Sequence, residues 1–395
     1  MEFAGNIFVK PLPMDAPFIY EKYVTGKHFL GRKTDCTVLA NLLRQGEHVA
    51  LYDAPKSGKQ SLVQQVLFNL RIEGQTFQAG QFSLQNIRTP EQFLLRLGAT
   101  LIRMSATTPA EYAALVQQYL GGTHFVFDPE RFAEADEVLS LSWEIDEADR
   151  EAMLRFPWQL ARERGQHYIL ILDQWQDILL LDEPDGILRP LEKIVQGETG
   201  QGLSLIFMGD RVNAMKSIFE GERCWLHRRV SLLRLSEVDE REIVEYMVKG
   251  FLSGGKVVDR DLLIGACRLF QNRLWYINHF AAILDAKSKG YITEVMLVES
   301  LDAILAIHEP RFCAMMDDLT THQVNFLRAV VDGKTQFSSA RVVREYALNS
   351  SANVKRVKDA LMKKEVLSFQ AEDEPHFLDP LFEYWVRKYY FEKPE

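Results

Sequence analysis

Residues 51–67, LYDAPKSGKQSLVQQVL, place a serine, a glycine and a lysine between an apolar segment and a segment with helical periodicity. This order of strand, loop and helix is the setting of the phosphate-binding motif G-x-x-x-x-G-K-[ST]. In such a loop, backbone N–H groups and a helix N-terminus point at the anion, and the lysine reaches its terminal phosphates. A polar turn with a solvated lysine is the alternative. The residues that we expect to form a nucleotide site are Lys56, Ser57, Gly58, Lys59, Gln60 and Ser61.

Two positions of this loop depart from the motif. Asp53 stands where the first glycine is expected, and Gln60 stands where the motif has the hydroxyl group that binds Mg²⁺. A carboxylate about 4 Å from a bound phosphate would cost roughly 4 kcal/mol at an effective dielectric constant of about 20. Gln60 could offer its amide oxygen to Mg²⁺, but it is longer than threonine and would crowd an octahedral site. The neighbouring Ser61 could partly replace the missing hydroxyl ligand of Mg²⁺.

A second acidic position ends the apolar segment YILILD, residues 168–173. An aspartate at the end of a buried strand can hold Mg²⁺, so Asp173 is the candidate metal ligand beside Gln60. The alternative is a carboxylate that only caps the turn after its strand. Gln174 follows, where a hydrolysing enzyme would have a glutamate. Because glutamine can orient water but is a negligible base, we expect slow hydrolysis or none.

The elements that must position these residues are five strand-like segments separated by helical patterns. Segments 167–173 and 203–209 are nearly continuous apolar runs, as expected for strands buried on both faces of a parallel sheet. The other three cover residues 48–52, 77–84 and 229–236. Strands that alternate with helices predict a three-layer α/β domain.

The strand pattern stops after Ser236. Four amphipathic segments predict an all-helical region up to about residue 308, and Pro310 predicts the next boundary. Beyond it, three helical patterns are followed by two short strands, LSFQ and HFLD, around an acidic turn. Three helices and a hairpin describe a winged helix. The predicted domains are therefore a P-loop core at 1–236, a helical lid at 237–309 and a winged helix at 310–395.

The winged-helix region is locally basic. Residues 320–368 contain nine Lys and Arg against four Asp and Glu, within a chain of net charge −9. Lys355, Arg356 and Lys358 lie on the third helix, where contacts with DNA phosphates would dominate affinity. We expect these three side chains to point away from the apolar side of that helix. The acidic turn AEDEP favours a surface that faces protein instead.

Four further segments make the chain resemble the archaeal-type predicted ATPases of the STAND and AAA+ branch of P-loop proteins. FLGRKTDCTVLANLL (29–43) is similar to the family's opening box, and LDPLFEYWVRKYY (378–390) to its C-terminal D-P-L-F-x-x-W motif. LSLIFMGDRVNAMKSIF (203–219) corresponds to the sensor strand, and RCWLHRRV (223–230) to an arginine-bearing segment. The lid segment QNRLWYIN lacks the family's Gly-x-Pro.

The resemblance implies a P-loop NTPase (AAA+/STAND-like) core with a parallel sheet, a helical lid and a winged helix. It implies ATP or ADP with Mg²⁺ as ligand, bound between core and lid. It places Arg32 near the adenine and Asp210, instead of a serine, after the sensor strand. Gln174 and Arg228 fall on catalytic positions.

Two functions remain open from the sequence. One is a nucleotide-binding switch with weak or no hydrolysis, which sets the orientation of the winged helix for a protein partner or for DNA. The other is a non-catalytic scaffold, or a DNA-associated protein, whose degenerate P-loop no longer binds nucleotide.

Composition limits the remaining classes. The chain has 395 residues, of which 47% are hydrophobic and 26% charged, as in an ordinary globular protein. No signal peptide and no run of eighteen apolar residues is visible, so we expect neither secretion nor a membrane span. The four cysteines are widely separated and indicate reduced thiols in the cytoplasm.

Overall fold

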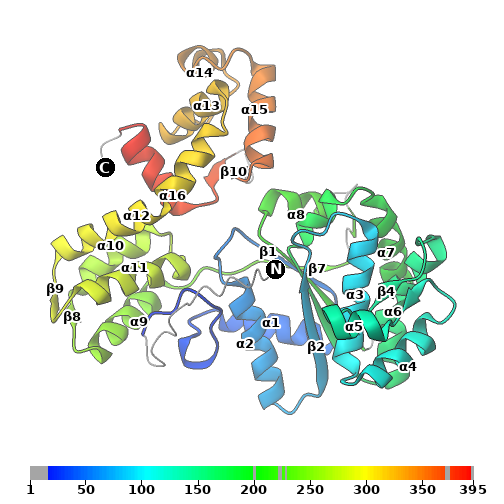
Figure 1. Ribbon diagram of the computed structural model, residues 1–395. Coiled ribbons are helices and arrows are strands. Elements are labelled where there is room, and N and C mark those ends of the chain that lie inside the picture. Colours follow the sequence, from blue (N-terminus) through cyan, green and yellow to red (C-terminus); the bar gives the residue numbers. More distant parts are fainter. Residues whose placement is uncertain (1–16, 199–201, 221–224, 227–228, 370–373, 393–395) are drawn as a thin grey trace. The chain divides into compact units, whose positions relative to one another are not determined.

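The computed structural model describes residues 17–198, 202–220, 225–226, 229–369 and 374–392 (Figure 1). The chain gathers into two compact units. We call residues 32–236 and 321–379 the core unit, and residues 1–31, 237–320 and 380–395 the helical unit. Because the core unit includes most of the winged-helix segment, these units cut across the predicted boundaries. The three-domain division stays a prediction.

A five-stranded parallel sheet forms the centre of the core unit, with the strand order β2-β5-β6-β1-β7. All five strands fall within the predicted segments, and the two long apolar runs coincide with β5 and β6, which pair with each other inside the sheet. β6 is buried at all seven positions. The strands are β1 (Val49–Tyr52), β2 (Phe77–Ser83), β5 (His167–Asp173), β6 (Leu203–Gly209) and β7 (Ser231–Leu233).

Helices cover both faces of this sheet, which confirms the predicted three-layer α/β fold (Figure 1). Helices α1 (Lys33–Arg44) and α2 (Lys59–Ile72) lie on one face. On the other face an apolar core joins alternate strand residues to helices that include α3 (Pro90–Ser105), α6 (Glu147–Arg164), α7 (Asp185–Gly197) and α8 (Val212–Phe219).

The region between α3 and α6 adds three short elements and one longer helix. Helix α4 (Pro109–Leu120), like α3, begins with a threonine cap followed by proline, an arrangement that satisfies free N–H groups. The following segment forms β3 (Phe125–Val126), α5 (Pro129–Ala135) and β4 (Ser140–Leu141).

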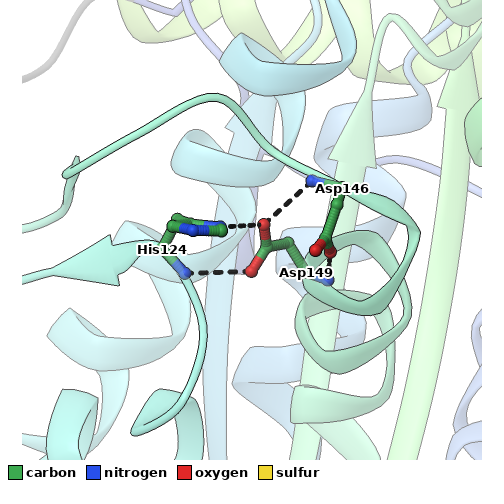
Figure 2. Close-up of side chains that lie close together, drawn as sticks. All are labelled: His124, Asp146 and Asp149. Carbon is green, nitrogen blue, oxygen red and sulfur yellow. Dashed lines mark hydrogen bonds and ion pairs between the residues drawn. The ribbon is translucent and has the colours of Figure 1, made fainter.

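A polar cluster fastens this β3–β4 pair to the start of α6 (Figure 2). The buried carboxylate of Asp149 accepts hydrogen bonds from the backbone N–H of His124 at 2.9 Å and from its imidazole Nδ1 at 2.7 Å. Asp149 and Asp146 also cap one another's backbone N–H groups. Because these bonds already occupy both oxygens of Asp149, the cluster acts as a structural junction.

The helical unit consists mainly of long helices, as predicted, with one short pair of parallel strands, β8 (Val257–Val258) and β9 (Tyr291–Ile292). Its helices are α9 (Glu240–Ser253), α10 (Arg260–Leu269), α11 (Leu274–Lys287), α12 (Glu294–Asp317) and α16 (Pro380–Trp385). Among the described residues, no helix is long and apolar enough to cross a membrane.

Pro310, where the sequence places a domain boundary, lies inside α12, so the helix does not end at this residue. A proline removes one backbone hydrogen bond from a helix interior. Here the helix continues because His308, Phe312 and Met316, spaced four residues apart, remain buried along one face. Burial of that face outweighs the lost hydrogen bond.

The winged helix is confirmed as three helices and an antiparallel hairpin. The hairpin strands pair Leu367 with Phe377 and Phe369 with Pro375. The elements are α13 (Thr321–Val331), α14 (Ala340–Glu345), α15 (Ser351–Lys363), β10 (Leu367–Phe369) and β11 (Pro375–Phe377).

Candidate functional site

The candidate nucleotide site lies at the carboxyl end of the parallel sheet, where loops from several strands meet. Asp53 follows β1, Asp173 ends β5 and Asp210 follows β6. The register pairs Tyr52 with Gly209, so the phosphate loop and the Asp210 loop leave adjacent strands at the same level. Ligands of open α/β sheets bind at this edge.

The loop has the backbone shape that its glycine predicts. Gly58 has φ 94° and leads directly into α2, so that the free N–H groups of the helix face the loop. Lys56 also has a left-handed backbone, with φ 65°. Ser57 is buried, and Arg32 donates a hydrogen bond from Nη1 to its carbonyl oxygen at 2.7 Å.

Lys59 is turned into this loop and is only 6% exposed. Its ammonium group donates to the carbonyl oxygens of Asp53 and Ala54, both at 3.0 Å, and to the Ser57 hydroxyl at 3.2 Å. A carboxylate oxygen of Asp210 lies 2.5 Å from the same ammonium group. The lysine that would reach the phosphates is therefore paired with an internal anion.

The glutamine that replaces a catalytic glutamate also contacts Asp210. Gln174 donates from Nε2 to the second carboxylate oxygen of Asp210 at 2.7 Å. Gln176 donates to the Gln174 side-chain oxygen at 2.6 Å and accepts from the Asp210 backbone N–H at 3.2 Å. Lys59, Asp210, Gln174 and Gln176 thus form one continuous polar chain.

The predicted metal ligands form a second chain beside the first. Gln60 donates to the side chain of Gln81 at 2.9 Å, and Gln81 reaches a carboxylate oxygen of Asp173 at 3.4 Å. Burial, the largest influence, raises the pKa of the Asp173 carboxyl, and the nearby Asp210 carboxylate adds to this; the Gln174 backbone N–H and Lys59 act in the opposite direction. A bound cation would reverse that balance.

Asp53, which replaces the first glycine of the motif, is used locally. Its carboxylate accepts a hydrogen bond from the backbone N–H of Ala54 at 2.7 Å. That N–H is one of the loop donors, and the carboxylate adds negative charge at the mouth of the loop. The Asp53 carboxylate is therefore hydrogen-bonded to the backbone of the phosphate loop.

Two participants in this network were not singled out from the sequence. Gln81 is a polar residue within the strand segment 77–84, and Gln176 lies two positions after Gln174. A polar side chain near the carboxyl end of a predicted parallel strand was the signal for Gln81. Gln176 had no comparable signal, because its role depends on the position of Asp210.

The remaining predicted site residues fall elsewhere. Arg32 contacts the phosphate loop and the Ser236 carbonyl, and its role at the adenine stays a prediction. Ser61 lies in the first turn of α2. Arg228 lies outside the described residues.

On α15 the expectation of three outward cations is wrong for one of them. Lys355 and Arg356 are exposed, but Lys358 is 9% exposed, with its ammonium group 5.3 Å and 5.0 Å from the ring centres of Phe337 and Phe369. Position 358 is four residues after Val354 and three before Leu361, so it shares their buried face. The basic surface is smaller than predicted.

Comparisons with known proteins agree with this architecture. A family model described as "Probable winged helix domain" matches residues 310–388. A Walker-type ATPase of Pyrococcus abyssi is similar over 94% of this chain and 99% of its own, with a TM-score of 0.65 and 14% identity. The Aeropyrum pernix ORC2 protein, solved in ADPNP and ADP complexes, covers 90% of this chain and 93% of its own, with a TM-score of 0.50 and 12% identity. No curated protein matched by sequence.

The fold is therefore that of a P-loop ATPase with a helical region and a C-terminal winged helix. In this fold the chain is similar to the Pyrococcus abyssi Walker-type ATPase and to the Aeropyrum pernix ORC2 protein. At these identities the likeness extends to the fold alone.

Proposed function

We propose that this chain is a nucleotide-responsive regulatory protein that binds ATP or ADP with Mg²⁺ and hydrolyses ATP slowly or not at all. The observation that carries the proposal is the 2.5 Å ion pair between Lys59 and Asp210. The carboxylate stands at the ammonium group where a phosphate would bind, so nucleotide and Asp210 compete for one lysine. Binding is then coupled to a movement of the loop after β6.

Retention of the loop supports binding. Gly58 keeps its left-handed backbone, Ser57 and Lys59 are buried, and the N-terminus of α2 faces the loop. Asp210 is 32% exposed, so its carboxylate can leave Lys59 for solvent without a large desolvation cost. Nucleotide phosphates could then take its place.

Weak hydrolysis follows from the side chains that surround Asp210. The Gln174 amide is committed to Asp210, and it lacks a carboxylate that could accept a proton. Gln60, at the position of the Mg²⁺-binding hydroxyl, is bonded to Gln81. A missing general base typically lowers a rate by about 10²–10⁴-fold.

The test is calorimetric titration of Mg-ATP and Mg-ADP into the wild type and three variants. We expect Asp210→Ser to bind at least about tenfold more tightly than the wild type, because it frees Lys59 and removes a like charge. Lys59→Ala should abolish binding. Asp185→Asn, which removes a carboxylate paired with Arg189 on α7, is the control and should bind as the wild type does.

The scaffold that binds no nucleotide is the second candidate, and the same ion pair favours it. If Asp210 permanently neutralises Lys59, the wild type will show no binding while Asp210→Ser gains it. Equal affinity of both proteins would show that Asp210 does not compete. Absence of binding in both would remove nucleotide from the function altogether.

For the winged helix we propose a surface that contacts a protein partner, with DNA as the alternative. The charge balance supports this choice, because only Lys355 and Arg356 of the three candidate cations are exposed. The three-domain division and a cytoplasmic location belong to the same proposal. They rest on the sequence pattern.

A further inference from the structure

Helix α8 begins two residues after Asp210 and has no cap of its own. Its N-cap residue, Arg211, makes no capping hydrogen bond with its side chain. The first backbone N–H groups of a helix have no partner within it, and they need one from elsewhere when they are partly buried. The chain supplies that partner from a distant position.

Glu365, which follows α15 in the winged helix, caps α8. Its carboxylate accepts from the backbone N–H of Asn213 at 3.0 and 3.1 Å, and from that of Ala214 at 3.0 Å. Glu365 has a left-handed backbone, φ 55°, which ends α15 and turns the side chain toward α8. A negative charge at a helix N-terminus is favourable.

The capping is reciprocal, because α8 also completes the end of α15. Asn213 donates from its side-chain amide to the carbonyl oxygens of Met362 at 3.0 Å and Leu367 at 2.9 Å. Arg211 donates to the carbonyl oxygen of Lys363 at 3.2 Å, and Lys216 reaches the Ser368 hydroxyl at 2.8 Å. The free N–H groups at the start of α8 and the free carbonyl oxygens at the end of α15 are therefore hydrogen-bonded by side chains from the opposite segment.

We propose that this reciprocal cap, Glu365 with Asn213, is an intramolecular latch through which the winged helix holds Asp210 on Lys59. Asp210 lies three positions before Asn213, and Arg211 between them is bonded to the end of α15. A docked winged helix therefore fixes the start of α8 and the loop that carries the competing carboxylate. Release of the latch frees Asp210 and opens Lys59 to phosphate. This regulation rests on the proposed function.

The latch also determines which partners can act on it. It uses the C-terminal end of α15 and strand β10, whereas Lys355 and Arg356 lie on the N-terminal half of α15 and are exposed. A partner that binds β10 competes with α8 and opens the site. A partner that binds only the exposed half of α15 leaves the latch closed.

The experiment measures amide hydrogen exchange in the wild type, Glu365→Ala and the control Glu374→Ala, which removes an exposed carboxylate before β11. Loss of a helix cap should make the amides of residues 213 and 214 exchange about fivefold faster. Faster exchange should extend to the phosphate loop, residues 53–60, and Glu374→Ala should change neither segment. Faster exchange at α8 with an unchanged phosphate loop would overturn the coupling. Unchanged exchange at both would overturn the latch.

Two additions keep the test decisive. Glu365→Gln retains an acceptor oxygen and should give a smaller effect in the same direction, which covers the case that Glu365→Ala does not fold. In calorimetry, Glu365→Ala should shift ATP affinity toward that of Asp210→Ser and add nothing to the double variant. Failure of Asp210→Ser itself to bind ATP would refute the proposed function, while the exchange measurement would still judge the latch.

Discussion

Arg32 donates hydrogen bonds from Nη1 to the Ser57 carbonyl oxygen at 2.7 Å and from Nε to the Ser236 carbonyl oxygen at 3.1 Å. It thereby joins the phosphate loop to the last residues of the core segment. Asp35 strengthens the same junction by accepting from the Ser236 backbone N–H at 2.9 Å. Arg32 thus braces the loop, and its predicted place near the adenine stays a prediction.

This brace makes a prediction for Gly58. A Cβ at Gly58 would lie 3.0 Å from Arg32 Nη1, and the backbone φ of 94° disfavours any L side chain. Gly58→Ala should therefore lower the free energy of unfolding by about 1–3 kcal/mol. In an Arg32→Ala background the loss should be smaller, because only the backbone strain remains.

Thermal and urea unfolding of the two single variants and the double variant measure this coupling. Gly74→Ala is the matched control, because Gly74 has φ 80° and open space around its Cβ position. Gly74→Ala should lower the free energy of unfolding by the same amount with or without Arg32. Additive effects of Gly58→Ala and Arg32→Ala, within about 0.5 kcal/mol, would contradict a contact between the two side chains.

A glutamate introduced at position 174 alone should not restore ATP hydrolysis. Gln174→Glu replaces an N–H donor, 2.7 Å from Asp210, with a second carboxylate, and two such charges repel by roughly 4 kcal/mol near 4 Å. We expect this variant to be less stable than the wild type and inactive. The combination Gln60→Thr, Gln174→Glu and Asp210→Ser should release phosphate measurably, because it restores a hydroxyl ligand and a base and frees Lys59.

Phosphate release under steady-state conditions checks this prediction. The wild type should show no turnover above background. Turnover near about 1 s⁻¹ in the wild type, at the low end for ordinary enzymes and abolished by Asp173→Asn, would mean that the substituted site still hydrolyses ATP.

The His124–Asp149 pair should make stability depend on pH (Figure 2). The hydrogen bond that the His124 imidazole donates to the Asp149 carboxylate raises the pKa of His124, although burial opposes it. Burial acts to raise the pKa of Asp149, but its hydrogen bonds to His124 and Asp146 lower it overall. The raised His124 pKa stabilises the fold below about pH 6.5, and this contribution is lost as the pH rises through the folded value. The lowered Asp149 pKa contributes above about pH 4.

Both contributions are therefore present between about pH 4 and 6.5. In urea unfolding at pH 5.5 and 8.5, His124→Gln should lower the free energy of unfolding more at the lower pH. Asp149→Asn should behave in the same way, and the double variant should lose little more than either single one. If the free energy of unfolding changed with pH in the same way in the wild type and in His124→Gln, the His124–Asp149 pair would not be the cause of the pH dependence.

The fold was predictable where burial dictates the pattern. The apolar runs that became β5 and β6 could be assigned to strands because both faces of a central parallel strand are buried. Local rules failed where tertiary packing decided, as at Pro310, which α12 passes through. Lys358 was expected to point away from the apolar side of α15, but it lies on the buried face with Val354 and Leu361.

The site was predictable as a set of residues but not as a network. Parallel strand ends meet at one edge, so the sequence could bring Lys59, Asp173 and Asp210 together. It could not show that Asp210 pairs with Lys59, or that Glu365 caps α8, because these contacts join residues about 150 positions apart. Such pairs depend on strand order and domain docking.

The winged helix supports a prediction in two parts. Only Lys355 and Arg356 are exposed among the three cations of α15, so two phosphate contacts would give a log–log salt slope of about −1.8. Reversal of both charges should abolish any DNA binding and leave the fold intact.

Lys358→Glu should unfold the winged helix, because it places a carboxylate among the rings that now contact an ammonium group. Lys358→Met, which keeps the volume, should remain folded. Gel shifts at low salt and at 200 mM salt, with circular dichroism of each variant, measure both parts. We expect weak binding that is lost at 200 mM, and tight binding there would contradict the protein-facing role.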